Sequence, residues 1–252
     1  MTVALPDSFL ARPIAHRGLH DRAAGRVENS LASISAAADA GYGIEIDLQC
    51  TRDDQAVVFH DYDLKRLTFE MGPVAQRSAA ELGQVALRDD AGTIPTLTQV
   101  LEVVAGRVPL LVEIKDQDGQ MGHDTGKLGA AVAAALDGYE GDVALMSFNP
   151  HHIVEMARLC PDRPRGLVTD PYRPDDWPTL PRPTCERLAG IPDFDHVQAS
   201  FISHNVRDLD APRVIDLKRQ GARILCWTVR SAEVEAEARK VADNVTFEGY
   251  TA

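Results

Sequence analysis

The sequence predicts an α/β fold, a closed (β/α)8 barrel of the TIM type with a small insertion after the second strand. Short runs rich in β-branched and other apolar residues recur eight times, and most are followed by an Ala-, Leu- and Glu-rich stretch with helical periodicity. This alternation over 252 residues is typical of a closed parallel barrel. A doubly wound open sheet is the alternative that fits the same alternation.

The predicted strands are short runs that precede helical stretches or turn residues. They span residues 13–17, 43–49, 109–115, 143–148, 165–169, 197–201, 223–229 and 244–248. Residues 30–40 after the first strand and 127–136 after the third are rich in alanine, so we expect a helix in each.

One region interrupts this alternation. Between the second and third predicted strands, the pattern indicates an extra strand at 56–60, an irregular stretch at 65–93 and a helix at 98–104. We interpret about 50–107 as an insertion on the barrel top, within a single domain that spans 1–252. Residues 170–183 contain five prolines, which predicts an irregular surface loop. Trp177 in this loop could cap the substrate, but we expect it to pack on the barrel surface.

Composition narrows the expected partners. The formal net charge of −12 argues against an extended basic surface for nucleic acid or anionic lipid. No window approaches the roughly 20 apolar residues of a membrane span, and the N-terminus has no secretory signal pattern. We therefore expect a cytoplasmic protein with no nucleic-acid partner and no stable membrane insertion, while homo-oligomerisation stays open. A small anionic substrate would then need a local positive centre, which a bound metal supplies.

The cysteines favour a reducing environment. Cys50, Cys160, Cys185 and Cys226 are scattered without C-x-x-C spacing. This spacing fits reduced structural thiols better than a disulfide framework or a zinc site.

Acidic residues alternate with apolar ones in two predicted strands. Glu45 and Asp47 share one strand face, as do Glu113 and Lys115 in the next barrel strand. Two carboxylates about 6 Å apart repel by about 3 kcal/mol at an effective dielectric of about 20, so they need a cation or a shared proton. Because barrel strands converge at their C-terminal ends, the three acids suit a hard cation, Mg²⁺ or Ca²⁺. The alternative is an ordinary strand-end salt bridge, such as Glu113 with Lys115, but two such pairs on apolar strands favour the metal site.

Two histidines directly follow apolar runs. His16 ends the first predicted strand and His60 ends the extra strand. Histidine exchanges protons near neutral pH, so the two form a candidate acid and base, although one strand-end histidine alone is more often structural.

Basic and amide side chains adjoin these candidates. Arg17 and Lys115 add positive charge that suits a phosphate, arginine through paired hydrogen bonds and lysine as a point charge. In Glu28-Asn-Ser, before the first predicted helix, a helix cap at Asn29 or Ser30 fits as well as a catalytic role.

Ten short motifs follow one another along nearly the whole chain: His16-Arg-Gly, Glu28-Asn-Ser, Gly43-Ile-Glu-Ile-Asp, Thr51-Arg-Asp-Asp, Val58-Phe-His-Asp, Leu64-Lys-Arg-Leu-Thr, Ile94-Pro-Thr-Leu, Glu113-Ile-Lys, Ser147-Phe and Trp227-Thr-Val. In this order they resemble the motifs of glycerophosphodiester phosphodiesterases. The signal lies in their combination, because His-Arg-Gly alone is weak.

The resemblance implies a phosphoric diester hydrolase of lipid and glycerol metabolism, which splits a small-molecule glycerophosphodiester into an alcohol and sn-glycerol 3-phosphate. It also implies one divalent cation, Mg²⁺ or Ca²⁺, with Mn²⁺ as a further option. The residues that match the family's motifs are Glu45, Asp47 and Glu113 for the metal, His16 and His60 for acid/base catalysis, and Arg17, Lys115, Asn29 and Trp227 for the substrate and its phosphate.

The chain departs from the common family pattern near its end. Many members end the last strand in Thr-Asp, whereas this chain has Thr246-Phe-Glu-Gly, which suggests a bacterial branch and leaves the role of Glu248 open. Arg230 stands where asparagine is frequent. A further phosphate contact is one alternative, and we interpret the residue as an exposed strand-end arginine.

Two alternatives to this function remain. A lysophospholipase D or sphingomyelinase D-like activity on lipid diesters would need an exposed apolar rim, whereas loop 170–183 is mostly polar. A catalytically silent binding barrel would lack a histidine or a metal acid, and all of them are present.

Overall fold

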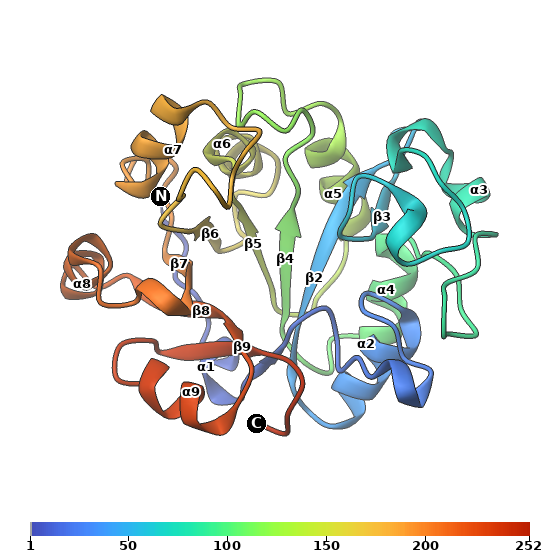
Figure 1. The fold of residues 1–252 in the computed structure, drawn as a ribbon, viewed down its shortest axis with the longest axis horizontal. Coiled ribbons are helices and arrows are strands. Elements are labelled where there is room, and N and C mark those ends of the chain that lie inside the picture. Colours follow the sequence, from blue (N-terminus) through green and yellow to red (C-terminus); the bar gives the residue numbers. More distant parts are fainter. Residues whose placement is uncertain (1) are drawn as a thin grey trace.

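The computed structural model describes residues 2–252, and within this range eight parallel strands close into a barrel with a ninth strand outside it (Figure 1). Strand β1 pairs with both β2 and β9, so the sheet closes on itself and the predicted barrel is confirmed. The barrel strands are β1 (Ile14–Ala15), β2 (Gly43–Cys50), β4 (Leu110–Ile114), β5 (Val143–Ser147), β6 (Arg165–Thr169), β7 (Phe201–Asn205), β8 (Arg223–Val229) and β9 (Asn244–Phe247).

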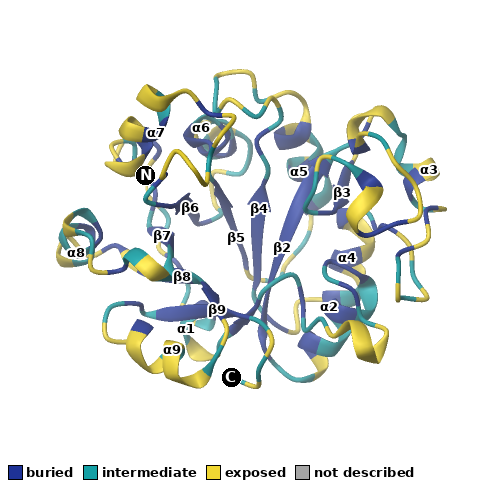
Figure 2. Cartoon of the chain, in the orientation of Figure 1, coloured by how far each residue is buried: buried dark blue, intermediate teal, exposed yellow. Residues whose placement is uncertain are grey.

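Helices surround the barrel, with exposed outer faces over buried strands (Figure 2). They are α2 (Leu31–Asp39), α4 (Leu97–Val104), α5 (Leu128–Leu136), α6 (Pro150–Leu159), α7 (Arg182–Ala189), α8 (Pro212–Arg219) and α9 (Ala232–Ala238), with short 3-10 turns η1 (Arg22–Ala24) and η4 (Val206–Asp208). Helices α2 and α5 confirm the two alanine-rich predictions. Their apolar faces pack on strand residues that point outward, such as Ile44 and Ile46.

The interior of the barrel is apolar at one end and partly charged at the other. Short helix α1 (Ser8–Ala11) inserts Phe9 at the N-terminal end, where it packs with Ile14, Leu111 and Leu225. Nearer the C-terminal strand ends, inward positions carry charged side chains on β2 and β4 and apolar ones, such as Met146 and Val168, on β5 and β6. A site for chemistry therefore lies at the C-terminal end, as in other barrels of this type.

The segment between β2 and α4 forms a small layer with its own core. Strand β3 (Ala56–Val58) runs antiparallel to β2 and is followed by η2 (Leu64–Arg66), η3 (Val74–Gln76) and α3 (Ala79–Leu82). Phe59 and Leu67 are among the residues that bury an apolar cluster there, separate from the main core. Helix α4 itself packs beside α2 and α5 in the outer ring of helices.

One predicted strand is wrong. The strand expected at 197–201 is β7 at Phe201–Asn205 instead, and the preceding residues form turns. Val197 and Ala199 alternate as in a strand because both are buried against the main core. The apolar pattern of the true strand is interrupted because it carries the polar residues Ser203, His204 and Asn205, of which Ser203 lines the cavity at the C-terminal end of the barrel.

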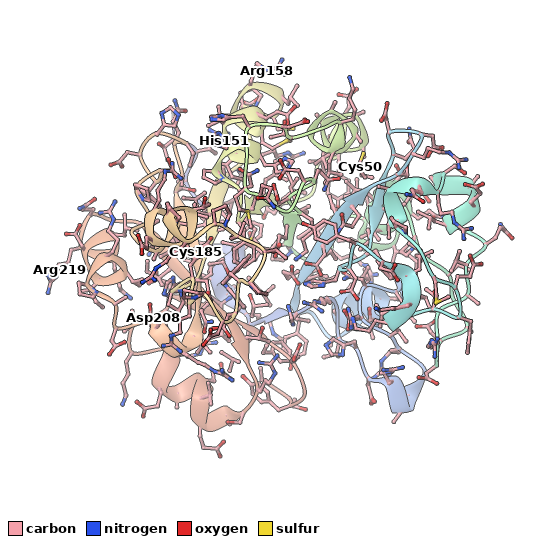
Figure 3. All side chains as sticks on the ribbon, turned by 45° about the horizontal axis from the view of Figure 1, so that its top comes forward. Cys50, His151, Arg158, Cys185, Asp208 and Arg219 are labelled. Carbon is pink, nitrogen blue, oxygen red and sulfur yellow. The ribbon has the colours of Figure 1, made fainter. Side chains whose placement is uncertain are left out.

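The cysteines are free, and Cys50 and Cys185 lie on different sides of the barrel (Figure 3). In the described part of the chain, no helix is long and apolar enough to cross a membrane. Exposed Arg158 on α6 and Arg219 on α8 mark the outer surface, away from the barrel interior (Figure 3).

Candidate active site

A cavity of about 660 Å³ opens at the C-terminal end of the barrel. Its wall combines strand ends, the loops that follow them and part of the insertion. Seven of the predicted site residues line it: His16, Arg17, Glu45, His60, Glu113, Lys115 and Trp227. The other two, Asp47 and Asn29, are buried directly behind them.

Three carboxylates gather at the base of this cavity. Each of Glu45, Asp47 and Glu113 has an oxygen within 4.8 Å of the others, and Asp47 and Glu113 are direct neighbours in the β2–β4 pairing. All three side chains are buried. Burial, together with the charges of Asp47 and Glu113, raises the pKa of Glu45 well above its usual value. The ionised form of Glu45 is therefore disfavoured, first by its burial and then by the two neighbouring carboxylates.

Of the three carboxylates, Asp47 has its negative charge best balanced by neighbouring groups. It accepts hydrogen bonds from Asn29 Nδ2 at 2.9 Å, and it pairs with Lys115 Nζ at 2.7 Å and with Arg17 Nε at 3.2 Å. Burial by itself would raise the pKa of Asp47, but Lys115, His60 and Arg17 outweigh it and hold that pKa well below its usual value. Lys115 also donates to Glu113 at 2.5 Å, so the salt bridge considered from sequence is present within the cluster.

In the strained turn after β1, a backbone N–H group points towards the same cluster. Arg17 and Asn29 adopt positive φ angles of 56° and 60°, which non-glycine residues seldom occupy. Gly18 follows with φ 79°, and a Cβ there would lie 2.6 Å from Ser33 Oγ of α2. In return, the Arg17 backbone N–H donates to Glu45 Oε2 at 3.0 Å. Ser30 caps α2, which leaves the Asn29 side chain free to hold Asp47.

Each histidine contacts one carboxylate through Nδ1. His16 Nδ1 lies 2.5 Å from Glu248 Oε2, and its Nε2 lies 4.0 Å from Glu45 Oε2. Burial lowers the pKa of His16 to about 4, despite the opposing effect of Glu248. His60 Nδ1 lies 2.7 Å from Asp61 Oδ1. Both rings thus have one nitrogen held by the protein.

Arg66 of the insertion connects the His60 side to the β1 side. It donates to Asp61 Oδ2 at 2.5 Å and to both oxygens of Glu28 at 2.8 Å. Arg17 donates to the same Glu28 at 2.7 Å. Burial would raise the pKa of Glu28, but Arg66 and Arg17 lower it to about 2. Glu28 therefore supports the site as an ionised bridge between two arginines.

The opposite wall of the cavity is apolar, formed by Met121, Met146, Phe148, Val168, Trp177 and Trp227. The expectation that Trp177 packs on the barrel surface is wrong, because Asp170 Oδ2 accepts from its Nε1 at 2.9 Å and fixes the ring beside the cavity. Phe148 lies between the two indoles, with ring centres 5.1 Å from Trp177 and 5.6 Å from Trp227.

Several residues around the cavity are not among those that the sequence predicts for the site. Asp61 and Arg66 belong to two of the ten motifs, Val58-Phe-His-Asp and Leu64-Lys-Arg-Leu-Thr, so the sequence does carry a signal for them. The apolar wall had no such signal, because its members come from segments far apart in the chain. Glu248 and Arg230 were noted only as departures, yet Arg230 Nε donates to Glu248 Oε1 at 2.8 Å.

A barrel whose C-terminal cavity combines buried carboxylates, two held histidines and basic side chains defines a hydrolase that acts on anionic esters. Residues 16–245 match the model of the "Glycerophosphoryl diester phosphodiesterase family". The chain belongs to this family and is a phosphodiesterase.

Known proteins are similar over nearly the full length. A putative glycerophosphodiester phosphodiesterase of Bacillus subtilis is 26% identical, across 89% of this chain and 88% of the relative. A glycerophosphodiester phosphodiesterase of Caldanaerobacter subterraneus is 25% identical, across 92% and 91%. The solved structure of an Oleispira antarctica phosphodiesterase, in complex with the product sn-glycerol-3-phosphate, is 26% identical, covers 96% of this chain and 94% of its own, and has a TM-score of 0.76.

Proposed function

We propose that this enzyme is a metal-dependent hydrolase of glycerophosphodiesters, which releases an alcohol and sn-glycerol 3-phosphate. The observation that carries the proposal is the meeting of His16, His60 and the carboxylate cluster around one cavity. The product named for the Oleispira antarctica structure supports the glycerol phosphate half of the substrate.

The donor set fits a hard divalent cation. Three buried carboxylates supply only oxygen ligands, which suit Mg²⁺ or Ca²⁺ and are also compatible with Mn²⁺. Burial first, and then the charges of Asp47 and Glu113, raise the pKa of Glu45 despite Lys115 and Arg17, and a bound cation would oppose both effects. Glu45, Asp47 and Glu113 would hold the ion, which when bound stabilises negative charge on the phosphoryl oxygens.

The protein's own groups account for the remaining steps. Arg17 and Lys115 face the cavity and would bind the non-bridging oxygens of the phosphate. One histidine removes a proton from the attacking hydroxyl, of water or of the substrate itself, and the other protonates the leaving alkoxide. With water as the nucleophile, one phosphorus–oxygen bond forms and one breaks. With the substrate's own hydroxyl, the alcohol leaves as a cyclic phosphodiester forms, and water then opens that ring, so either route converts a diester and water into an alcohol and a phosphomonoester. Trp227 would contact the substrate from the apolar wall.

The test is a coupled assay for sn-glycerol 3-phosphate over a panel of glycerophosphodiesters, each with Mg²⁺, Mn²⁺ or Ca²⁺ and with EDTA. We expect turnover that depends on the added metal. Full activity in EDTA would remove the metal from the scheme, and no release from any member of the panel would overturn the substrate class.

Lipid diesters are a second candidate, favoured by two observations. The apolar wall can accept a hydrophobic group, and the insertion beside the cavity exposes Tyr62, Phe69 and Met71, the latter two by 73% and 75%. A rat lysophospholipase D is 33% identical over 120 residues, or 42% of this chain and 37% of the relative. A choline-release assay that compares glycerophosphocholine with lysophosphatidylcholine decides between the two.

A further inference from the structure

Glu248 is a carboxylate that the catalytic scheme above does not use. It follows β9 and lies on the opposite side of His16 from the carboxylate cluster, with its side chain 19% exposed. Its Oε2 contacts His16 Nδ1 at 2.5 Å and stands 3.5 Å from His20 Nε2. Its Oε1 accepts from Arg230 Nε at 2.8 Å. Donors therefore occupy both oxygens.

This contact selects one form of the His16 ring. A carboxylate only accepts hydrogen bonds, so Nδ1 must carry the proton that lies between them. In a neutral ring the other nitrogen, Nε2, is then an acceptor, and it points towards the cluster, 4.0 Å from Glu45 Oε2. With Glu248 absent, the ring could rotate or place its proton on Nε2, and both changes remove the acceptor from the cavity.

Arg230 fixes Glu248 in turn. The guanidinium contacts Oε1 through both Nε and NH2, each at 2.8 Å, which leaves Oε2 for the histidine. The two residues belong to the ends of neighbouring strands, β8 and β9. Arg230 is thus more than the exposed strand-end residue that its sequence position indicated, although its side chain is 60% exposed.

We infer that Glu248 is a positioning residue that holds His16 as the Nδ1–H tautomer, so that Nε2 accepts the proton of the attacking hydroxyl. Arg230 orients Glu248 for this task. The inference rests on the proposed function, because it presumes that His16 takes part in proton transfer. It adds a role for Glu248 and Arg230, which the proposed function leaves unassigned.

The first test compares Glu248→Leu, which keeps much of the side-chain volume but offers no acceptor, with Glu248→Gln, which retains one amide oxygen. We expect kcat to fall about 100-fold in the leucine variant, with KM and the Mg²⁺ concentration for half-activity unchanged within about threefold. The glutamine variant should recover at least about tenfold of that loss. Glu237→Gln on α9 is the matched control. Glu237 lies in the segment between β8 and β9, and it pairs with exposed Lys240.

The second test reads the wild-type ring directly and uses a variant only to assign its signal. Nitrogen-15 spectra of histidine-labelled wild-type enzyme at pH 8, with the His16 signal assigned from His16→Gln, report which ring nitrogen carries the proton. The inference requires Nδ1–H in the wild type. An Nε2–H ring in the wild type overturns it, as does a leucine variant with more than a third of wild-type kcat. If His16→Gln itself is fully active, the proposed role of His16 fails first, so the two failures are distinguishable.

Discussion

The two sides of the cavity hold their histidines by different means. His16 belongs to the barrel, its side chain is 12% exposed, and its carboxylate partner comes from 232 residues further along the chain. His60 belongs to the insertion, its side chain is 33% exposed, and its partner is the next residue, Asp61. The barrel therefore supplies one buried histidine together with the carboxylate cluster. The insertion supplies the other histidine, His60, which is held by the neighbouring Asp61. Arg66 connects this pair to the barrel through hydrogen bonds to Asp61 and Glu28.

Removing either histidine is expected to have the largest effect. His16→Ala and His60→Ala should each lower kcat by about 100-fold to 10,000-fold, because each loses one proton-transfer step. Circular dichroism and thermal unfolding should stay close to wild type. His196→Ala is the control, because His196 is exposed and lies outside the cavity. Retention of more than a tenth of the activity by both variants would break the assigned pair.

Removing the metal should lower the thermal stability of the barrel, and not that of the insertion. All three proposed ligands come from β2 and β4, so a cation bound there stabilises the folded barrel. At about 100 times its dissociation constant, this is about 2.7 kcal/mol, which raises the melting temperature by about 5 °C in a chain of this size. Thermal-shift measurements should show this rise with Mg²⁺ in the wild type and lose it in Glu113→Gln. An equal rise in both proteins would place the bound ion elsewhere.

Removing the hydrogen bonds that Arg66 makes between the insertion and the barrel should have an intermediate effect on activity. Arg66→Ala removes the hydrogen bonds to Asp61 and Glu28, so the insertion keeps its own core but orients His60 less well. We expect kcat/KM to fall about tenfold with metal affinity unchanged, measured in the coupled assay at several Mg²⁺ concentrations. Arg77→Ala provides the comparison, since Arg77 pairs with exposed Glu70 in the same insertion. Equal losses in both variants would show that the insertion responds as a whole.

The same contrast explains what the sequence could predict. Inward acids at a spacing of two residues identified the Glu45, Asp47 and Glu113 cluster, because strand geometry fixes which side chains share a face. His60 and Asp61 are adjacent, so their pairing needed no tertiary information. The pairing of His16 with Glu248 depends on closure of β1 against β9, which local sequence does not encode. The bounds of β7 and the position of Trp177 could not be predicted for a related reason. The polar residues of β7 interrupt the apolar pattern that indicates a strand, and the sequence of a proline-rich loop does not show which way an aromatic side chain points.

The smallest expected effect is the loss of stability when Glu28 is replaced. Glu28 connects the barrel to the insertion, because it pairs with Arg17 of the barrel and with Arg66 of the insertion. Its pKa of about 2 lies below the usual 4.5, so the ionised form is favoured in the folded state. The resulting stability is present above pH 4.5 and is lost as the pH falls towards 2. Glu28→Gln should therefore lower the free energy of unfolding by about 1 kcal/mol at pH 7, because the amide keeps some hydrogen bonds but loses the charge. Urea unfolding at pH 7, 5 and 3 measures the gap between variant and wild type, which should narrow as the pH falls below about 4.5. A gap that stays constant with pH would mean that Glu28 acts by packing, and that no ionised bridge joins the insertion to the barrel.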